Sequence, residues 1–313
     1  MKTEKKLRLM MYTGLCVTIV AVVLACLAMI FEFESDIGYY AHSAPFHTVA
    51  QVLAVMLLLF ATVMAFSFKK NELCQIINYD STAFRFFASM TACLSLLCAY
   101  VEFTNLIASL RASVVKASTG NVLSALALIF SVASFFVYIN YCFGKNEKKS
   151  ESRGLCGMLT VAYLIIHLME THVLWTTQMN NPTKIALQIA LIVLVFGLIY
   201  TYKCEFAVNK TSSRLRVLFM LICPVFVLTF SIPTIIAYYA RIYADFKVLV
   251  DAIYLTSVCG FVLSSYMPMS KARPIAAAEW AAINAKKEAQ AEASDDSADS
   301  NDQNNNESTE KEA

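Results

Sequence analysis

The chain has 313 residues, of which 58% are hydrophobic and 15% are charged, with a formal net charge of +2 at pH 7. A soluble domain is ordinarily about a quarter charged, so this composition argues against an ordinary water-soluble protein and favours a membrane protein. Backbone polar groups in lipid must pair within the protein, and the apolar runs lack the ten-residue alternation of a membrane β-barrel. The runs are therefore predicted to be helices.

Eight apolar runs follow one another along the chain, each close to the ~20 residues that a helix needs to cross the hydrocarbon core. They cover residues 9–31, 46–68, 86–108, 122–143, 155–175, 185–202, 215–239 and 246–267. We predict an all-α fold for residues 1–270: an integral membrane bundle of eight transmembrane helices arranged as four hairpins.

The basic residues predict the orientation of this bundle. Of the 25 Lys and Arg residues, five belong to the first, third, fifth and seventh loops, which leaves 20 for the N-terminus, the even loops and the C-terminal tail. The five are Arg111, Lys116, Lys184, Arg241 and Lys247. The positive-inside rule then places both termini in the cytoplasm. Together with the short loops, this favours a cell membrane of the bacterial inner-membrane type.

Two segments follow the bundle. Residues 271–293 are rich in Ala, Glu and Lys and are expected to form a short cytoplasmic amphipathic helix, with Trp280 and Ile283 near the membrane surface. Residues 294–313 are rich in Asp, Asn, Ser and Glu and have no apolar pattern, so we expect a disordered acidic tail.

Three consecutive runs carry polar residues at helical spacing, and such faces are expected to turn toward each other rather than toward lipid. The third run has Thr91, Ser95, Cys98, Glu102 and Asn105; the fourth has Ser124, Ser131, Ser134, Tyr138 and Tyr141; the fifth has Cys156, Thr160, Tyr163, His167 and Glu170. For the small and hydroxylated residues, ordinary helix packing in the membrane is a sufficient explanation.

Packing explains the carboxylates less well. An ionisable residue at the centre of a membrane helix costs about 3 kcal/mol on insertion scales and is by default a candidate for function. Glu102 is expected about six residues, or ~9 Å, from the outer end of its helix, and Glu170 and Asp251 are expected near outer ends as well. We therefore predict an outward-facing ligand site from these polar residues: Gln51, Glu102, Asn105, His167, Glu170, Gln188 and Asp251.

All four histidines are predicted on the outer side, and histidine and carboxylate groups are suitable ligands for a divalent metal. The candidate set is His42, His47, His167, Glu170 and His172. The spacing is irregular, because His172 is five residues from His167 and leaves its helix face. Independent interfacial histidines are the simpler interpretation, and no cofactor is otherwise predicted.

The seventh run contains Pro224 and Pro233. Proline removes a backbone donor and kinks a helix, and interrupted helices line binding sites in many transporters. Prolines are also common in static membrane helices, and the small number of glycines, eight in the whole chain, favours a static bundle.

Three classes of function remain open. The first is a small transporter or a protein that binds a cation or polar ligand. The second is a non-catalytic sensor, assembly factor or subunit that acts with another membrane protein. The third is a membrane-embedded metal hydrolase. The chain has no Walker-type phosphate-binding loop and no nucleophile motif, so an enzyme is not favoured. The expected partners are the lipid bilayer and either a second membrane protein or a further copy of the chain, without nucleic acid.

Overall fold

The structure, a computed structural model, describes residues 2–34, 38–41, 43–67, 81–112, 119–143, 150–173, 181–206, 213–242 and 245–266. The segments predicted at 271–293 and 294–313 lie outside the described residues, and so does His42.

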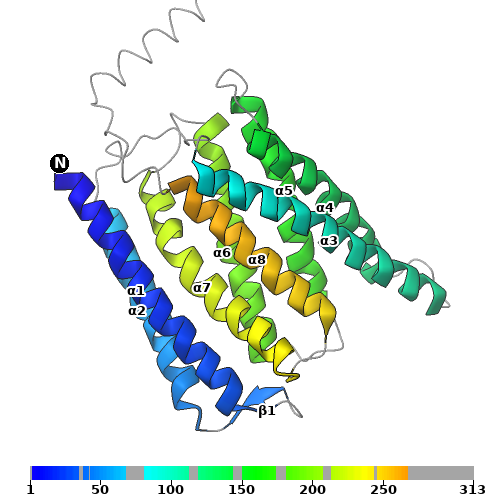
Figure 1. Cartoon of the computed structure of the whole chain (residues 1–313), viewed down its shortest axis with the longest axis horizontal. Coiled ribbons are helices and arrows are strands. Elements are labelled where there is room, and N and C mark those ends of the chain that lie inside the picture. The colour runs from blue at the N-terminus through cyan, green and yellow to red at the C-terminus, as the bar shows by residue number, and fades with distance from the viewer. Residues whose placement is uncertain are drawn as a thin grey trace, which may run out of the picture.

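Within these ranges the chain is nearly all helical, and eight helices are long and apolar enough to span a membrane, which confirms the predicted multi-pass membrane protein. The helices are α1 (Lys2–Phe31), α2 (Pro45–Phe66), α3 (Thr82–Ala112), α4 (Thr119–Phe143), α5 (Ser150–Val173), α6 (Pro182–Phe206), α7 (Ser213–Tyr239) and α8 (Phe246–Tyr266). They run side by side, and the start of α1 lies at the same end of the bundle as the end of α8 (Figure 1).

Six of the helices form a closed ring. Each helix from α3 to α7 packs against the next, and α8 packs back against α3. The pair α1 and α2 lies outside this ring against α7, and these two helices are the least buried of the eight, whereas α8 is the most buried. The ring is therefore the part of the protein that can enclose a site.

Aromatic side chains fill one half of the ring. The Phe261 ring on α8 contacts Phe84 from α3, Tyr138 and Tyr141 from α4, and Tyr202 from α6, at centroid distances of 4.9 to 6.4 Å. All five side chains are fully buried. Aromatic pairs in these geometries stabilise a core beyond the area that they bury, so this half holds the ring together.

The loop after α1 contains two short strands that the sequence did not predict. β1 (Phe33–Glu34) pairs antiparallel with β2 (Tyr39–Tyr40), and Gly38 precedes β2 with a φ of +73°, a conformation that favours glycine. The Asn181 side chain donates a hydrogen bond to the Gly38 carbonyl at 3.1 Å. This contact ties the loop to the start of α6.

α3 is longer than the apolar run that predicted it. It continues to Ala112, so Glu102 lies ten residues, or about 15 Å, from that end. This distance from the helix end is longer than the six residues expected from the apolar run. α5 and α8 differ from α3, because Glu170 is three residues from the end of α5 and Asp251 is five residues after the start of α8.

α7 is helical from Ser213 to Tyr239, with Pro224 and Pro233 inside it. It contacts α1, α2, α6 and α8, and thus joins the outer helix pair to the ring. Between the two prolines, the Thr229 hydroxyl donates to the Val225 carbonyl at 2.5 Å.

Candidate functional site

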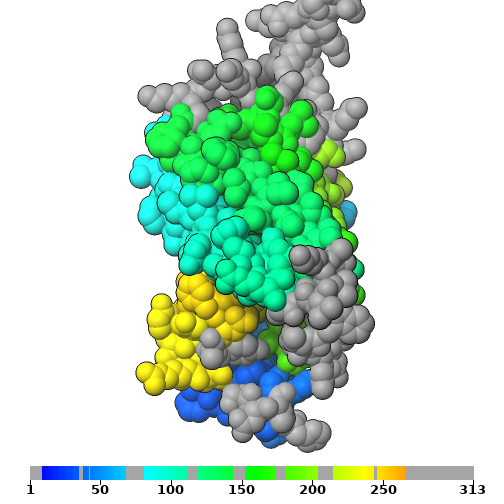
Figure 2. All heavy atoms as spheres, turned by 90° about the vertical axis from the view of Figure 1, so that its right-hand side faces the viewer, coloured from blue at the N-terminus to red at the C-terminus, as the bar shows by residue number. Residues whose placement is uncertain are grey.

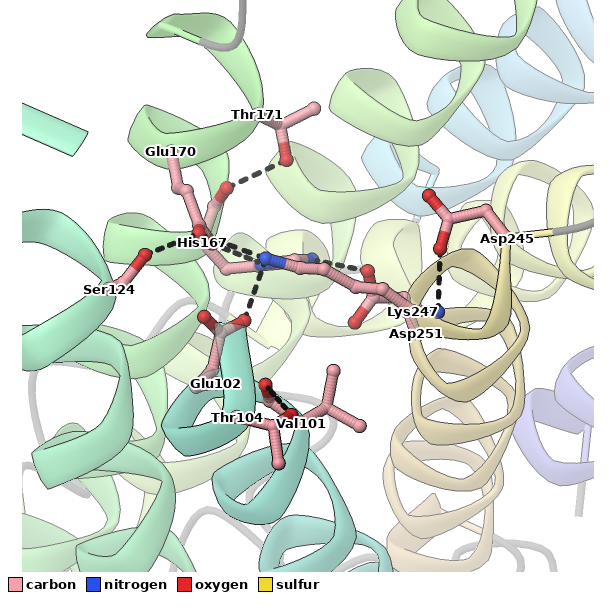
Figure 3. A network of polar contacts seen from close by, with 10 residues as sticks. All are labelled: Val101, Glu102, Thr104, Ser124, His167, Glu170, Thr171, Asp245, Lys247 and Asp251. Atoms are coloured by element: carbon pink, nitrogen blue, oxygen red, sulfur yellow. Dashed lines mark hydrogen bonds and ion pairs between the residues drawn. The ribbon is translucent and has the colours of Figure 1, made fainter. Parts of the chain in front are cut away.

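Charged side chains from three helices of the ring meet at one point inside it. α3 contributes Glu102, α5 contributes His167 and Glu170, and α8 contributes Lys247 and Asp251 (Figure 3). We call these five residues the charge cluster. His167 and Glu170 are three residues apart, and so share one face of α5; Lys247 and Asp251 are four apart and share one face of α8.

Lys247 links the two glutamates. Its Nζ lies 2.8 Å from Glu102 Oε1 and 2.9 Å from Glu170 Oε1, so one ammonium group bridges carboxylates from two helices. Charge-assisted hydrogen bonds of this length are the strong ones in proteins. The bridge fixes the start of α8 to α3 and to the end of α5.

The His167 imidazole lies between the carboxylates of Glu170 and Asp251. Its Nδ1 is 3.5 Å from Glu170 Oε2 and its Nε2 is 3.4 Å from Asp251 Oδ2. The ring also stacks on Tyr163, one turn earlier on α5, at a centroid distance of 6.1 Å. The orientation of the imidazole is therefore set by a carboxylate beside each ring nitrogen and by the stacked Tyr163 ring.

α4 contributes one neutral contact. The Ser124 hydroxyl donates a hydrogen bond to Glu170 Oε1 at 3.0 Å. Glu170 Oε1 thus accepts from both Ser124 and Lys247, and four of the six ring helices contribute to the site.

The cluster is buried and contains more acidic than basic side chains. Glu102 is 2% exposed and Lys247 is 19% exposed, so the lysine is the most accessible member. Three carboxyl groups face two basic groups, the Lys247 ammonium and the His167 imidazole. Buried charge is costly unless it is paired, and here each acidic side chain lies within ion-pair distance of a basic one.

Several polar atoms of the cluster have no hydrogen-bond partner within the described structure. They are Glu102 Oε2, Glu170 Oε2 and both ring nitrogens of His167. Glu102, His167 and Glu170 each offer one ligand atom, and these three atoms lie within 4.8 Å of one another, close enough to hold one metal ion.

The structure brings together four of the seven residues predicted for the ligand site: Glu102, His167, Glu170 and Asp251. Asn105 is exposed on α3. Gln51 is exposed on α2, where its side chain contacts His47 at 2.8 Å. Gln188 is partly buried on α6, and its Nε2 has no hydrogen-bond partner among the described residues.

The predicted histidine set is not assembled. His47 stacks on Tyr40 at the start of α2, a helix that packs on α1 and α7 rather than on α5. His172 is exposed. Close to His47, the Glu32 carboxylate accepts hydrogen bonds from the backbone N–H groups of Phe46 and His47 at 2.8 and 3.0 Å. Of the predicted metal ligands within the described ranges, only His167 and Glu170 lie together.

Lys247 was not among the predicted site residues, because it was counted as a basic residue of an outer loop. Its spacing of four residues from Asp251 would have placed both on one helix face. Of the polar residues predicted on the third run, Cys98 lies near Glu102 and Asp251, whereas Thr91 bonds Ser257 of α8 at 2.7 Å.

Figure 2 shows the face of the molecule where the end of α3 and the start of α4 lie next to the end of α7 and the start of α8. No protein-family model matches this chain, and no curated protein or solved structure matches it either.

Proposed function

We propose that this membrane protein binds a cation at the charge cluster and transports it, exchanging it with the ammonium group of Lys247. The observation that carries the proposal is the bridge from Lys247 Nζ to Glu102 and Glu170, at 2.8 and 2.9 Å. A tethered ammonium there occupies a position that suits a free cation.

The position of Lys247 supports exchange. It is the second residue of α8, and its backbone N–H donates to the exposed Asp245 side chain at 2.8 Å. Its long side chain can turn away without moving the helix. The glutamates are fixed within α3 and α5, so the cluster would remain in place while its cation changes.

Burial supports a functional role over a purely stabilising one. Replacing buried ion pairs by packed apolar residues is often neutral or stabilising, so an ionic cluster inside a membrane bundle is weak evidence for stability. Intramembrane ionisable residues commonly mark ion pathways.

Thermal unfolding of the purified protein in detergent tests cation binding. A cation that binds the native state must raise the unfolding midpoint by mass action. We expect at least one cation, from a panel of monovalent and divalent chlorides at constant ionic strength, to stabilise the wild type and to lose its effect in Glu102→Gln and Glu170→Gln.

Glu32→Gln is the matched control, because Glu32 is a buried carboxylate outside the charge cluster. The control should keep the stabilisation. Equal responses of the wild type and of both cluster variants to every cation would contradict the proposal and would favour a static bundle that acts as a subunit of a larger assembly.

A further inference from the structure

We propose that the cation is a divalent transition metal, bound by Glu102, His167 and Glu170 in place of Lys247. This inference rests on the proposed function and narrows it to one class of ion. Two carboxylates and one imidazole are a suitable ligand set for Zn²⁺, Mn²⁺, Fe²⁺ or Co²⁺. Ca²⁺ prefers six to eight oxygen ligands, and Mg²⁺ keeps most of its water, so the histidine selects against both.

The unused ligand atoms carry the argument. His167 is 3% exposed, and neither of its nitrogens has a hydrogen-bond partner in the described structure. Glu102 Oε2 and Glu170 Oε2 are likewise without one. Buried polar atoms are nearly always hydrogen-bonded. Glu102, His167 and Glu170 each offer one ligand atom within 4.8 Å of the other two, so one bound ion could be shared by all three residues.

The two sides of the imidazole assign separate roles. Nδ1 faces Glu170 at 3.5 Å and Nε2 faces Asp251 at 3.4 Å. A histidine that binds metal through one nitrogen commonly donates its other N–H to a carboxylate, which fixes the ring. We assign Nδ1 to the metal and Nε2–H to Asp251, which makes Asp251 a positioning residue and not a ligand.

The charges favour a divalent ion over a monovalent one. The three carboxylates and Lys247 sum to two negative charges when His167 is neutral. A monovalent ion in place of the ammonium would leave this sum unchanged, whereas a divalent ion reduces it to one. Lys247 is thus a competitor tethered to the protein. Metal can bind only while the ammonium group is out of the site, so the apparent metal affinity is the intrinsic affinity multiplied by the fraction of time that the site is free of Lys247.

Cobalt provides the direct test, because Co²⁺ bound to nitrogen and oxygen ligands absorbs visible light. We would titrate the full-length protein in detergent with Co²⁺ and displace it with Zn²⁺. We expect one Co²⁺ per chain in the wild type, and binding at least about tenfold tighter in Lys247→Met because the tethered competitor is gone. Lys184→Met is the matched control, a buried lysine at the start of α6, and it should bind as the wild type does.

A folded Lys247→Met that binds Co²⁺ no more tightly than the wild type would overturn the inference. Should that variant fail to fold, the wild type and His167→Gln decide the matter: His167→Gln must lose the visible spectrum, and identical titrations would overturn the inference. Stabilisation of the wild type by a monovalent cation, without Co²⁺ binding, would refute the metal and leave the proposed function standing.

Discussion

Lys247 Nζ lies 2.8 Å from Glu102 Oε1 and so joins the second residue of α8 to a residue within α3. Removing one partner of a buried ion pair leaves the other charge uncompensated, which typically costs about 3–5 kcal/mol. Lys247 is 19% exposed, so water offsets part of that cost.

We expect Lys247→Met to lower the free energy of unfolding by about 2–3 kcal/mol, and Lys247→Met with Glu102→Gln to be less destabilised than the sum of the single variants. Reversible unfolding of the four proteins in mixed micelles gives this coupling, which should be about 0.5–3 kcal/mol. Strict additivity would show that the two side chains do not interact in the membrane protein.

Asp251→Asn tests the positioning of His167. An amide still fits beside Nε2 but holds the imidazole less well, and loss of an outer partner typically costs about 10–100-fold in metal affinity. We expect Co²⁺ affinity to fall by this factor while the stoichiometry stays at one per chain. Unchanged affinity would remove Asp251 from the site.

Glu32→Gln should act on α2 alone. The Glu32 carboxylate accepts the Phe46 and His47 backbone N–H groups, which lie at the start of α2, and losing a helix cap costs about 1 kcal/mol. Hydrogen exchange at the start of α2 should increase, while cation binding at the charge cluster stays as in the wild type. A loss of cation binding would show that the two regions are coupled.

Gly260→Ala tests the contact between α8 and α3. A methyl group at Gly260 would overlap the Phe87 ring, so that side chain must move. Overpacking of this kind costs about 1–3 kcal/mol. Thermal unfolding should show the loss, and Phe87→Leu combined with Gly260→Ala should recover part of it; a variant as stable as the wild type would contradict the close approach.

The helices were predictable because lipid leaves the backbone few choices, and all eight apolar runs appear as helices. Helical spacing also predicted that His167 and Glu170 share one face. The free-energy cost of placing an ionisable side chain in lipid identified Glu102 and Asp251 as candidates. The partners across the ring were not predictable, because a single sequence does not state which face of a helix meets which neighbour. The predicted site therefore included Gln51 and Asn105, which are exposed. It omitted Lys247, because the charge of this lysine had been used to predict the orientation of the bundle by the positive-inside rule.

Cation uptake into proteoliposomes tests the central claim most directly. Vesicles containing the wild type, Glu102→Gln or Glu32→Gln would be filled with a metal-sensitive dye and exposed to Zn²⁺ or Co²⁺. The account predicts uptake with the wild type and with Glu32→Gln, and uptake at the rate of empty vesicles with Glu102→Gln. Equal uptake by all three proteins, or none by the folded wild type, would contradict transport through the charge cluster.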